Sequence, residues 1–315
     1  MSNLSYAIIG TGAIGGYYGA CLQRAGNQVH FLLHSDYQHV KENGLIIESP
    51  YRNFTLPRVQ AYQDARRMPA SDVVIVTLKT KHNKLLSQIL PFVLKDSGVV
   101  LVLQNGLGVE EQVEQIVGGE RVIGGVCFIC SHKVGPGHIR HLDFGAIAMA
   151  EYLPNYQTAG LTERMEQIAA DFEAAEIEIQ LSIDLLLIRW QKLVWNIPYN
   201  GLSVVLNATT EQLMADEEIR SLIEAIMGEV ALVASTCHRQ IEESFIQKML
   251  SITEKMKPYR TSMKIDYDNR QPLEIEAIIG NPLKVAAAAG VDLPRIRMLY
   301  QQLKFLDSLN CQQRV

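Results

Sequence analysis

The sequence lacks an excess of basic charge and lacks any long hydrophobic run. It has 29 Lys and Arg residues against 34 Asp and Glu residues, a formal net charge of −5 at pH 7. Proteins held mainly by nucleic-acid phosphates or by anionic lipid carry a basic excess, so we expect neither a nucleic acid nor a membrane as partner. No apolar run approaches the roughly 20 residues that a membrane-spanning helix needs. The first 20 residues are apolar but have no basic start, so we expect no signal peptide.

Cysteine is scarce and odd in number, with five residues in the chain. This count does not make a disulfide framework, and a reducing, cytoplasmic compartment is the simpler interpretation. Cys127 and Cys130 have C-x-x-C spacing, but a zinc site needs a second ligand pair, and none is suitably spaced. We therefore expect both side chains to pack in a core, and we expect no metal site.

The composition is that of a globular protein, with 48% hydrophobic and 20% charged residues in a chain of 315. At roughly 150 residues per domain, this length predicts about two domains. The first half alternates apolar runs typical of buried parallel strands with helical segments, which is the pattern of β-α-β units. The predicted strands are 6–9, 28–33, 72–78, 99–103 and 121–129, and the predicted helices include 81–94 and 109–117.

Helical periodicity dominates the second half. A turn at 135–137, flanked by short strand-like stretches, precedes predicted helices at 161–174, 185–195, 218–237, 241–255, 274–289 and 295–309. The fold class that follows is an α/β N-terminal domain of the Rossmann type, which binds dinucleotides, plus an all-α C-terminal domain. We place the boundary near residue 180, so the predicted domains are 1–180 for the cofactor and 181–315 for substrate and catalysis.

The glycines Gly10, Gly12 and Gly15 form a G-x-G-x-x-G pattern between the first strand and a helix. The first glycine allows a tight turn, the second lets a pyrophosphate approach the backbone, and the third permits close packing of helix and strand. The helix N-terminus then offers free N–H groups and a favourable dipole to the negative charge. In this context the motif predicts dinucleotide binding.

The end of the second strand is where the adenosine ribose should lie. NAD-binding domains place Asp or Glu there, whereas NADP-binding domains use Arg and small polar groups. Here His34 and Ser35 follow the strand, with no carboxylate directly at its end and no arginine. The prediction is NADPH as cofactor, with the 2′-phosphate near His34 and Ser35 and with NADH as the alternative.

Five further segments carry chemistry-bearing residues. Lys79 and the run Q-N-G-L-G at 104–108 follow consecutive strands, at the sheet edge that lines a ligand crevice. Downstream lie K-L-V-W-N-I-P-Y-N at 192–200, T-S-M-K-I-D at 261–266 and E-I-E-A-I-I-G at 274–280. Together with the glycine loop, these motifs resemble the ketopantoate reductase family (2-dehydropantoate 2-reductases) over nearly the whole chain.

The resemblance implies two catalytic residues. Lys192 matches the lysine that acts as general acid on the ketone oxygen, and Glu274 matches the glutamate that assists this lysine. A lysine ammonium suits that role because it places positive charge where the oxyanion develops and then donates a proton. Lys192 also lies in an apolar stretch, where a charge without a function is costly. No metal ion is required.

The resemblance also implies two sets of binding residues. Those expected to bind substrate are Asn196, Asn200, Ser262 and Asn105. Those expected to bind the cofactor are Gly10, Thr11, Gly12, Ala13, Ile14, Gly15, His34, Ser35, Lys79, Asn105 and Glu274. The sequence departs from the family pattern in three ways: His34 replaces a usual arginine, Gly201 replaces a common proline, and Trp195 and Pro198 lie within the 192–200 block. A proline inside a helix removes an N–H donor, so we expect a kink there.

The predicted activity is reduction of 2-dehydropantoate to D-pantoate by NADPH, on the route to pantothenate and coenzyme A. The partner is thus a small 2-keto acid, and the apolar helical half also allows a homodimer. Two alternatives stay open. One is a reductase of another 2-keto acid or an imine on the same fold. The other is a sensor that binds NAD(P) without chemistry, although such a protein has no use for the proton donor Lys192.

Overall fold

The computed structural model describes residues 4–312, which divide into two compact units. Unit 1 holds the chain up to Gln104 together with Val109–Ile188. Unit 2 holds Asn105–Gly108 and the chain from Arg189 onward. The sequence places the domain boundary near residue 180, and the structure changes unit within a helix at Ile188. The short segment Asn105–Gly108, which follows a strand of unit 1, is part of the helical unit 2.

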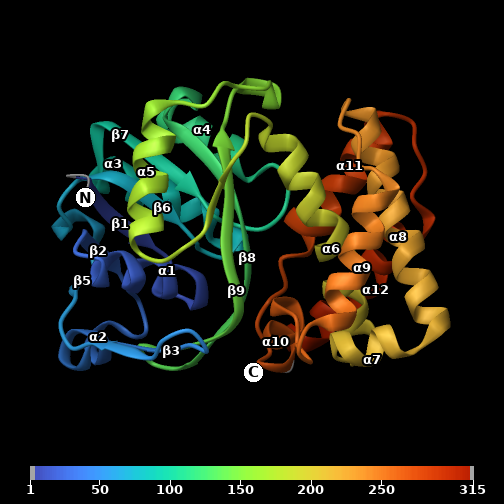
Figure 1. Ribbon diagram of the computed structural model, residues 1–315, viewed down its shortest axis with the longest axis horizontal. Helices are drawn as coiled ribbons and strands as arrows, with labels where there is room; N and C mark the ends of the chain where they lie inside the picture. Colours follow the sequence, from blue (N-terminus) through green and yellow to red (C-terminus); the bar gives the residue numbers. More distant parts are fainter. Residues whose placement is uncertain (1–3, 313–315) are drawn as a thin grey trace. The chain divides into compact units, whose positions relative to one another are not determined.

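A ten-stranded sheet runs through the described part of unit 1, in the order β4-β3-β9-β8-β7-β6-β1-β2-β5, with β10 paired to β9 (Figure 1). Strands β7, β6, β1, β2 and β5 are all parallel, whereas β8 and β9 form an antiparallel hairpin. The strands are β1 (Ser5–Ile9), β2 (Gln28–Leu32), β3 (Leu45–Glu48), β4 (Phe54–Leu56), β5 (Gln60–Tyr62), β6 (Ser71–Val76), β7 (Leu94–Val102), β8 (Val122–Gly135), β9 (His138–Glu151) and β10 (Ile179–Leu181).

Helices cover both faces of this sheet. Helices α1 (Ala13–Arg24) and α5 (Glu163–Ala174) contact each other on one face, and α3 (Leu86–Val93) and α4 (Val109–Val117) contact each other on the other (Figure 1). A further helix, α2 (Tyr37–Asn43), follows β2. Because both faces are covered, the central strands are apolar throughout, and every residue of β1 is buried. The chain reverses strand order between β1 and β6, which is where such sheets bind ligands.

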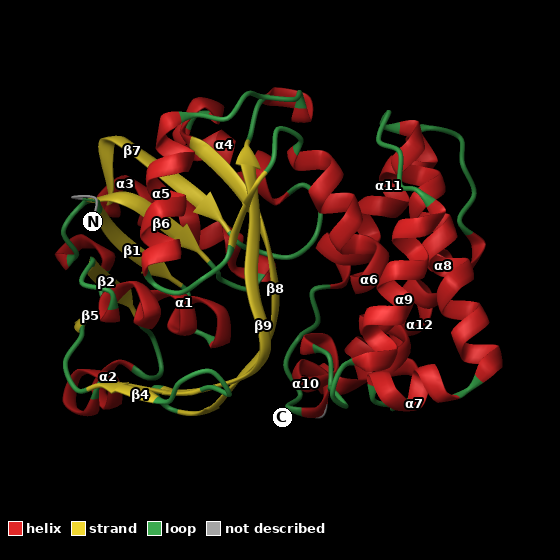
Figure 2. Cartoon of the chain, in the orientation of Figure 1, coloured by secondary structure: helices red, strands yellow, loops and turns green. Residues whose placement is uncertain are grey.

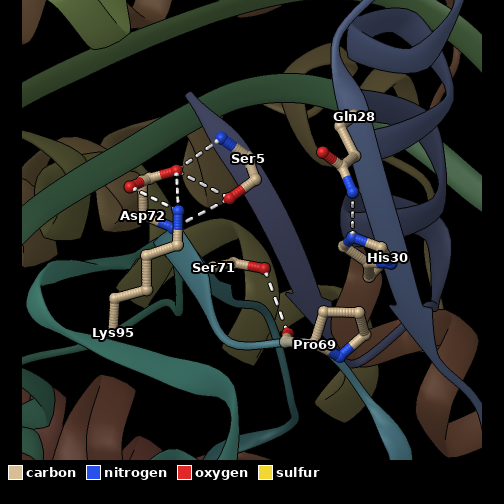
Figure 3. A network of polar contacts seen from close by, with 7 residues as sticks. All are labelled: Ser5, Gln28, His30, Pro69, Ser71, Asp72 and Lys95. Carbon is tan, nitrogen blue, oxygen red and sulfur yellow. Dashed lines mark hydrogen bonds and ion pairs between the residues drawn. The ribbon is translucent and has the colours of Figure 1, made fainter. Parts of the chain in front are cut away.

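A polar network joins the starts of β1 and β6. The carboxylate of Asp72 accepts hydrogen bonds from the backbone N–H of Ser5 at 2.9 Å and from its hydroxyl at 2.7 Å, and it pairs with Lys95 Nζ at 2.8 Å (Figure 3). Burial acts to raise the pKa of Asp72, but the hydrogen bonds from Lys95 and Ser5 outweigh it and lower the pKa below its ordinary value. The network fixes the sheet edge opposite to the glycine loop.

Among the described residues of unit 2, all regular secondary structure is helical, and loops connect the helices (Figure 2). Most of α6 belongs to this unit, and Pro198 lies inside that helix without ending it. The helices are α6 (Leu185–Val205), α7 (Thr210–Ala215), α8 (Glu217–Thr236), α9 (Glu243–Lys255), α10 (Ser262–Asp268), a π-helix (Glu276–Gly280), α11 (Asn281–Ala288) and α12 (Pro294–Gln312).

The predicted fold class is confirmed: a Rossmann-like domain with a curled mixed sheet is followed by a helical domain. Three local predictions were wrong. The stretches around the 135–137 turn are long strands, because β8 and β9 pair over most of their 14 residues each. Helix α6 continues ten residues past the predicted end at 195. The predicted helix 274–289 begins as a π-helix and then becomes α11. Within residues 4–312, no helix is both long and apolar enough to cross a membrane.

We expect the substitution Asp72→Asn to destabilise unit 1 in a pH-dependent way. The folded pKa is lowered, so the carboxylate stabilises the fold above its unfolded pKa of about 3.9, and this contribution is lost as the pH falls through the folded pKa. At pH 7 the free energy of unfolding should fall by about 1–2 kcal/mol. Urea titrations from pH 7 to pH 3 measure this difference, which should shrink toward acid. Asp96→Asn, at an exposed carboxylate on β7, is the control; an equal loss at every pH would contradict the prediction.

Candidate cofactor and substrate sites

The glycine loop follows β1 and packs against the end of β6. Gly10 has a φ of +103°, and a Cβ there would lie 2.5 Å from the backbone nitrogen of Leu78. The Thr77 hydroxyl donates to Gly10 O at 2.7 Å, and a Cβ on Gly15 would lie 2.4 Å from that hydroxyl oxygen. These two glycines are therefore required by packing within the protein itself. Lys79 follows this contact directly, so the predicted Gly10 and Lys79 come together at one strand edge.

Gly12 is different, because no atom among residues 4–312 requires a glycine there. A Cβ there would have its nearest neighbour at 4.0 Å, the carbonyl oxygen of Gly10. Gly12 is also the N-cap of α1, where no side chain makes a capping hydrogen bond within the described residues and no acidic residue lies in the first turn. The first N–H groups of a helix lack partners inside the helix. The loop over Gly10–Gly15, with Thr11, Ala13 and Ile14, therefore fits the diphosphate of a dinucleotide.

The end of β2 lies beside this loop. The Thr11 hydroxyl donates to Leu32 O at 3.0 Å, which ties the loop to the last residue of the strand. His34 and Ser35 follow and are exposed. The predicted contacts for the diphosphate and for the adenosine ribose thus share one edge of the sheet.

Asp36 is the carboxylate nearest in sequence to this strand end, and it is already bonded. Its two oxygens accept from Lys133 Nζ at 2.8 and 2.7 Å, from the N–H of Gly137 at 3.1 Å and from the Ser35 hydroxyl at 3.0 Å. The residue is only 6% exposed. Burial acts to raise its pKa, but Lys133 and Gly137 outweigh burial and lower the pKa. A ribose diol would have to displace these donors to reach Asp36.

In unit 2, helix α6 carries three predicted residues at intervals of four. Positions four apart share a helix face, so Lys192 and Asn196 project from one side. Lys192 Nζ lies 5.6 Å from the ring centroid of Trp195. Asn196 is 3% exposed, and its amide nitrogen donates to Asn105 Oδ1 at 3.3 Å. Asn196 and Asn105, 91 residues apart in sequence, are therefore neighbours, as two residues of one substrate site should be.

Asn200 connects α6 to α10. Its side-chain oxygen lies 3.5 Å from the backbone nitrogen of Met263, in the first turn of α10, and Ser262 is the first residue of that helix. The Ser203 hydroxyl, one turn after Asn200, lies 2.8 Å from that of Thr261, the N-cap of α10. The predicted Asn200 and Ser262 are thus brought together through the N-terminus of α10.

Glu274 is 8% exposed and lies just before the π-helix. Its backbone oxygen accepts from the N–H of Ile278 at 3.2 Å. Short π-helical turns are rare in proteins, and those that occur often lie at functional sites. The loop that follows Asn105 bonds to this same π-helix, because the N–H of Leu107 donates to Ala277 O at 2.9 Å.

Sequence reasoning missed several residues that hold the loops of the candidate sites. Thr77 and Gln104 hold the loops that follow β1 and β6, since Gln104 Nε2 donates to Leu78 O at 2.6 Å. Asn281 holds the loop after Asn105 through Leu107 O, at 2.7 Å. The pair Asn281-Pro282 inside a helical pattern was the available signal, because proline is unfavourable there. Asn105, predicted to bind both substrate and cofactor, lies in unit 2.

The five cysteines, all among the described residues, form no disulfide. Cys127 and Cys130 are both buried within β8, at 8% and 6% exposure. Among residues 4–312, no group of three or more His, Cys, Asp or Glu side chains is arranged to hold a metal ion.

Substitutions at Gly12 and Gly15 provide a matched pair of predictions. Gly15→Ala should lower the melting temperature, because its Cβ would overlap the Thr77 hydroxyl and Gly10 O. Gly12→Ala should leave the melting temperature near that of the wild type but weaken dinucleotide binding at least tenfold, since its methyl group would occupy space that the protein leaves open. Thermal unfolding and fluorescence titration with NADPH measure the two effects. Equal binding by wild type and Gly12→Ala would contradict the assignment of the diphosphate to this loop.

Comparisons with known proteins agree with this architecture. A family model described as ketopantoate reductase PanE/ApbA matches residues 6–154, and its C-terminal counterpart matches residues 184–307. The chain is 59% identical over 310 residues to a 2-dehydropantoate 2-reductase from Nostoc sp., covering 98% of this chain and 97% of that protein.

Solved structures show the same likeness. The crystal structure of 2-dehydropantoate 2-reductase from Geobacter metallireducens matches with a TM-score of 0.92 and 40% identity, over 96% of this chain and 99% of that one. A D-mandelate dehydrogenase solved with NADH and anilino(oxo)acetate shares the fold, with a TM-score of 0.88, 20% identity and coverage of 98% and 99%. This chain belongs to the ketopantoate reductase family.

Proposed function

We propose that this protein reduces 2-dehydropantoate to D-pantoate, a step of pantothenate and coenzyme A biosynthesis. It is an NAD(P)-dependent oxidoreductase by family, and the Nostoc relative carries the name of this reaction. The observation that carries the proposal is the hydrogen bond from the Asn196 amide to Asn105. Asn196 lies on α6, one turn after Lys192. A lysine beside a cluster of buried amides suits an anionic keto acid, since amides donate hydrogen bonds to its oxygens.

The residues divide the reaction between them. The reduced nicotinamide, when bound, supplies a hydride to the carbonyl carbon. Lys192 Nζ holds the proton that passes to the carbonyl oxygen, so that the ketone becomes a hydroxyl. Asn196, Asn200 and Ser262 hold the substrate's carboxylate and hydroxyl. Glu274, largely shielded from water, orients Lys192 and accepts from a substrate hydroxyl.

The apolar surroundings of Lys192 make its charge effective. Its ammonium lies near the Trp195 ring, whose indole N–H donates to the Thr253 hydroxyl at 2.9 Å and which stacks on Tyr199 at 4.8 Å. A ring held by two such contacts is fixed in place and keeps one side of the ammonium away from water. Electrostatic stabilisation of a developing oxyanion is strongest in such a site.

We infer that NADPH is preferred over NADH. Asp36, the only carboxylate within two residues of His34, is engaged by Lys133, Gly137 and Ser35, and so is not presented to a ribose diol. The exposed His34 and the partly exposed ammonium of Lys133 offer donors to a phosphate instead. Homodimer formation and a cytoplasmic location stay predictions; exposed Met298, Phe305 and Leu309 on α12 suit the former.

The substitution Lys192→Ala should lower kcat by about 10²- to 10⁴-fold, the usual contribution of a general acid, and leave NADPH binding intact. Oxidation of NADPH, followed by absorbance with saturating 2-dehydropantoate, measures kcat. Lys248→Ala removes an exposed lysine from α9 and is the control. Unchanged turnover in Lys192→Ala would remove the lysine from the mechanism.

A panel of substrates separates the two alternatives. Turnover on another branched 2-keto acid or on an imine, exceeding that on 2-dehydropantoate in kcat/KM, would favour the related reductase. NADPH binding without turnover on any compound would favour the sensor.

The cofactor preference has its own test. The wild type should bind NADPH at least tenfold more tightly than NADH, and His34→Asp should reverse the ratio, because a carboxylate repels the 2′-phosphate and accepts from a ribose diol. Fluorescence titrations with both dinucleotides measure the four dissociation constants. His39→Asp places the same charge on the exposed surface of α2 and should leave the ratio unchanged. Tighter binding of NADH by the wild type would refute the preference.

A further inference from the structure

The loop Asn105–Gly108 is held at both backbone groups of one residue, Leu107, by the π-helix of unit 2 and the residue that follows it. The N–H of Leu107 donates to Ala277 O at 2.9 Å, and Asn281 Nδ2 donates to Leu107 O at 2.7 Å. Both backbone groups of Leu107 are thus paired with residues 170 or more positions away in the sequence. We call these two hydrogen bonds the Leu107 clamp.

Two features leave the carbonyl of Ala277 available for the clamp. One is the i to i+5 hydrogen bonding of the π-helix, and the other is Pro282. In this segment the N–H of Asn281 bonds to Glu276 O, five residues back. The next bond in the same register would join the N–H of residue 282 to Ala277 O. Pro282 has no N–H, so this bond cannot form. Ala277 O is a buried acceptor that would otherwise be left unsatisfied, and Leu107 supplies the missing donor.

Gly106 allows the loop to come this close. Its φ is +100°, and a Cβ there would lie 2.5 Å from Ala277 O and 2.6 Å from the Ala277 carbonyl carbon. Only glycine fits both the backbone conformation and the space. The loop and the π-helix therefore meet backbone to backbone, which leaves little freedom in the position of Asn105.

Two site residues adjoin the clamp. Asn105 lies two residues before Leu107, and its side-chain oxygen accepts from Asn196. Glu274 lies three residues before Ala277, and its carbonyl accepts from the N–H of Ile278, within the π-helix. Holding Leu107 against Ala277 therefore fixes the backbones that carry Asn105 and Glu274 relative to each other.

We propose that Asn281 and Pro282 are positioning residues of the reductase. Pro282 leaves Ala277 O to the N–H of Leu107, and Asn281 holds the carbonyl of the same residue, so that the Asn105 amide stays against Asn196. The proposal deepens the proposed function and rests on it, because the benefit of the clamp is a fixed amide at the substrate.

Two variants weaken the clamp from its two sides. Asn281→Asp keeps the shape of the side chain but removes the donor to Leu107 O. Pro282→Ala restores an N–H that competes for Ala277 O, and it introduces no larger side chain. Lys284→Met is the matched control: Lys284 Nζ donates to Asn281 Oδ1 at 3.0 Å, so this variant removes a contact of the same amide without touching the clamp.

The full chain is measured by hydrogen exchange and by steady-state kinetics, with thermal unfolding and NADPH binding as controls. Amide hydrogen exchange should be at least tenfold faster at Leu107 in both variants and unchanged in Lys284→Met. The kcat/KM for 2-dehydropantoate should fall by about 10- to 100-fold in both variants, since a misplacement of about 1 Å can cost on the order of 10² in rate. The melting temperature and the dissociation constant for NADPH should stay near the wild-type values, which a general loss of structure would not allow.

The outcomes are distinct. Faster exchange at Leu107 with unchanged kcat/KM would overturn the positioning role, and so would a loss of activity with unchanged exchange. A wild-type chain without activity on any 2-keto acid would contradict the proposed function instead, and the exchange rates alone would then decide whether the clamp exists.

Discussion

Close approach of two backbones, with no side chain between them, is the constraint on which both candidate sites depend. In unit 1, Gly10 lies against the end of β6 with a φ of +103°, and in unit 2, Gly106 lies against Ala277 with a φ of +100°. In each case a Cβ would come within 2.5 Å of a backbone atom. Both glycines follow parallel strands, β1 and β7, whose carboxyl ends carry the ligand loops of such sheets. Backbone contact places these loops more rigidly than flexible side chains would.

The second common feature concerns buried polar side chains. The hydrogen bonds that satisfy these side chains also fix their positions. Asn196 and Asn200 are almost fully buried on α6, and an unpaired amide there would cost several kcal/mol. Asn196 bonds to Asn105, and Asn200 reaches the first turn of α10. The amides that we assign to the substrate are thus also the connections between the segments of unit 2. In unit 1 the Asp36–Lys133 pair has the same double role, because it fixes the β8–β9 turn and engages the carboxylate nearest to the strand end that we assign to the ribose.

Prediction from the sequence succeeded where the signal is local. The glycine spacing identified the loop and its place before α1, and helix α4 was predicted with its observed bounds, because its apolar positions recur at helical intervals. Prediction failed where the length of an element depends on contacts with residues far away in the sequence. The hairpin β8–β9 was underestimated, because His132 and Lys133 interrupt the apolar run while cross-strand pairing continues through Arg140. Helix α6 was ended too early, because burial of the residues around Pro198 outweighs the hydrogen bond that proline removes.

The sequence by itself determined the alternation of the central strands and helices of a Rossmann-like domain, the helical class of the second domain, and the set of residues typical of the ketopantoate reductase family. Those features depend on spacing along the chain, which a sequence records directly. Only the tertiary structure decided that Asn105 belongs with unit 2, that Asp36 is engaged by Lys133, and that the π-helix accepts a bond from Leu107. Each of these depends on a partner about 100 or more residues away, and which donor reaches a given carbonyl or carboxylate is settled only when the chain has packed.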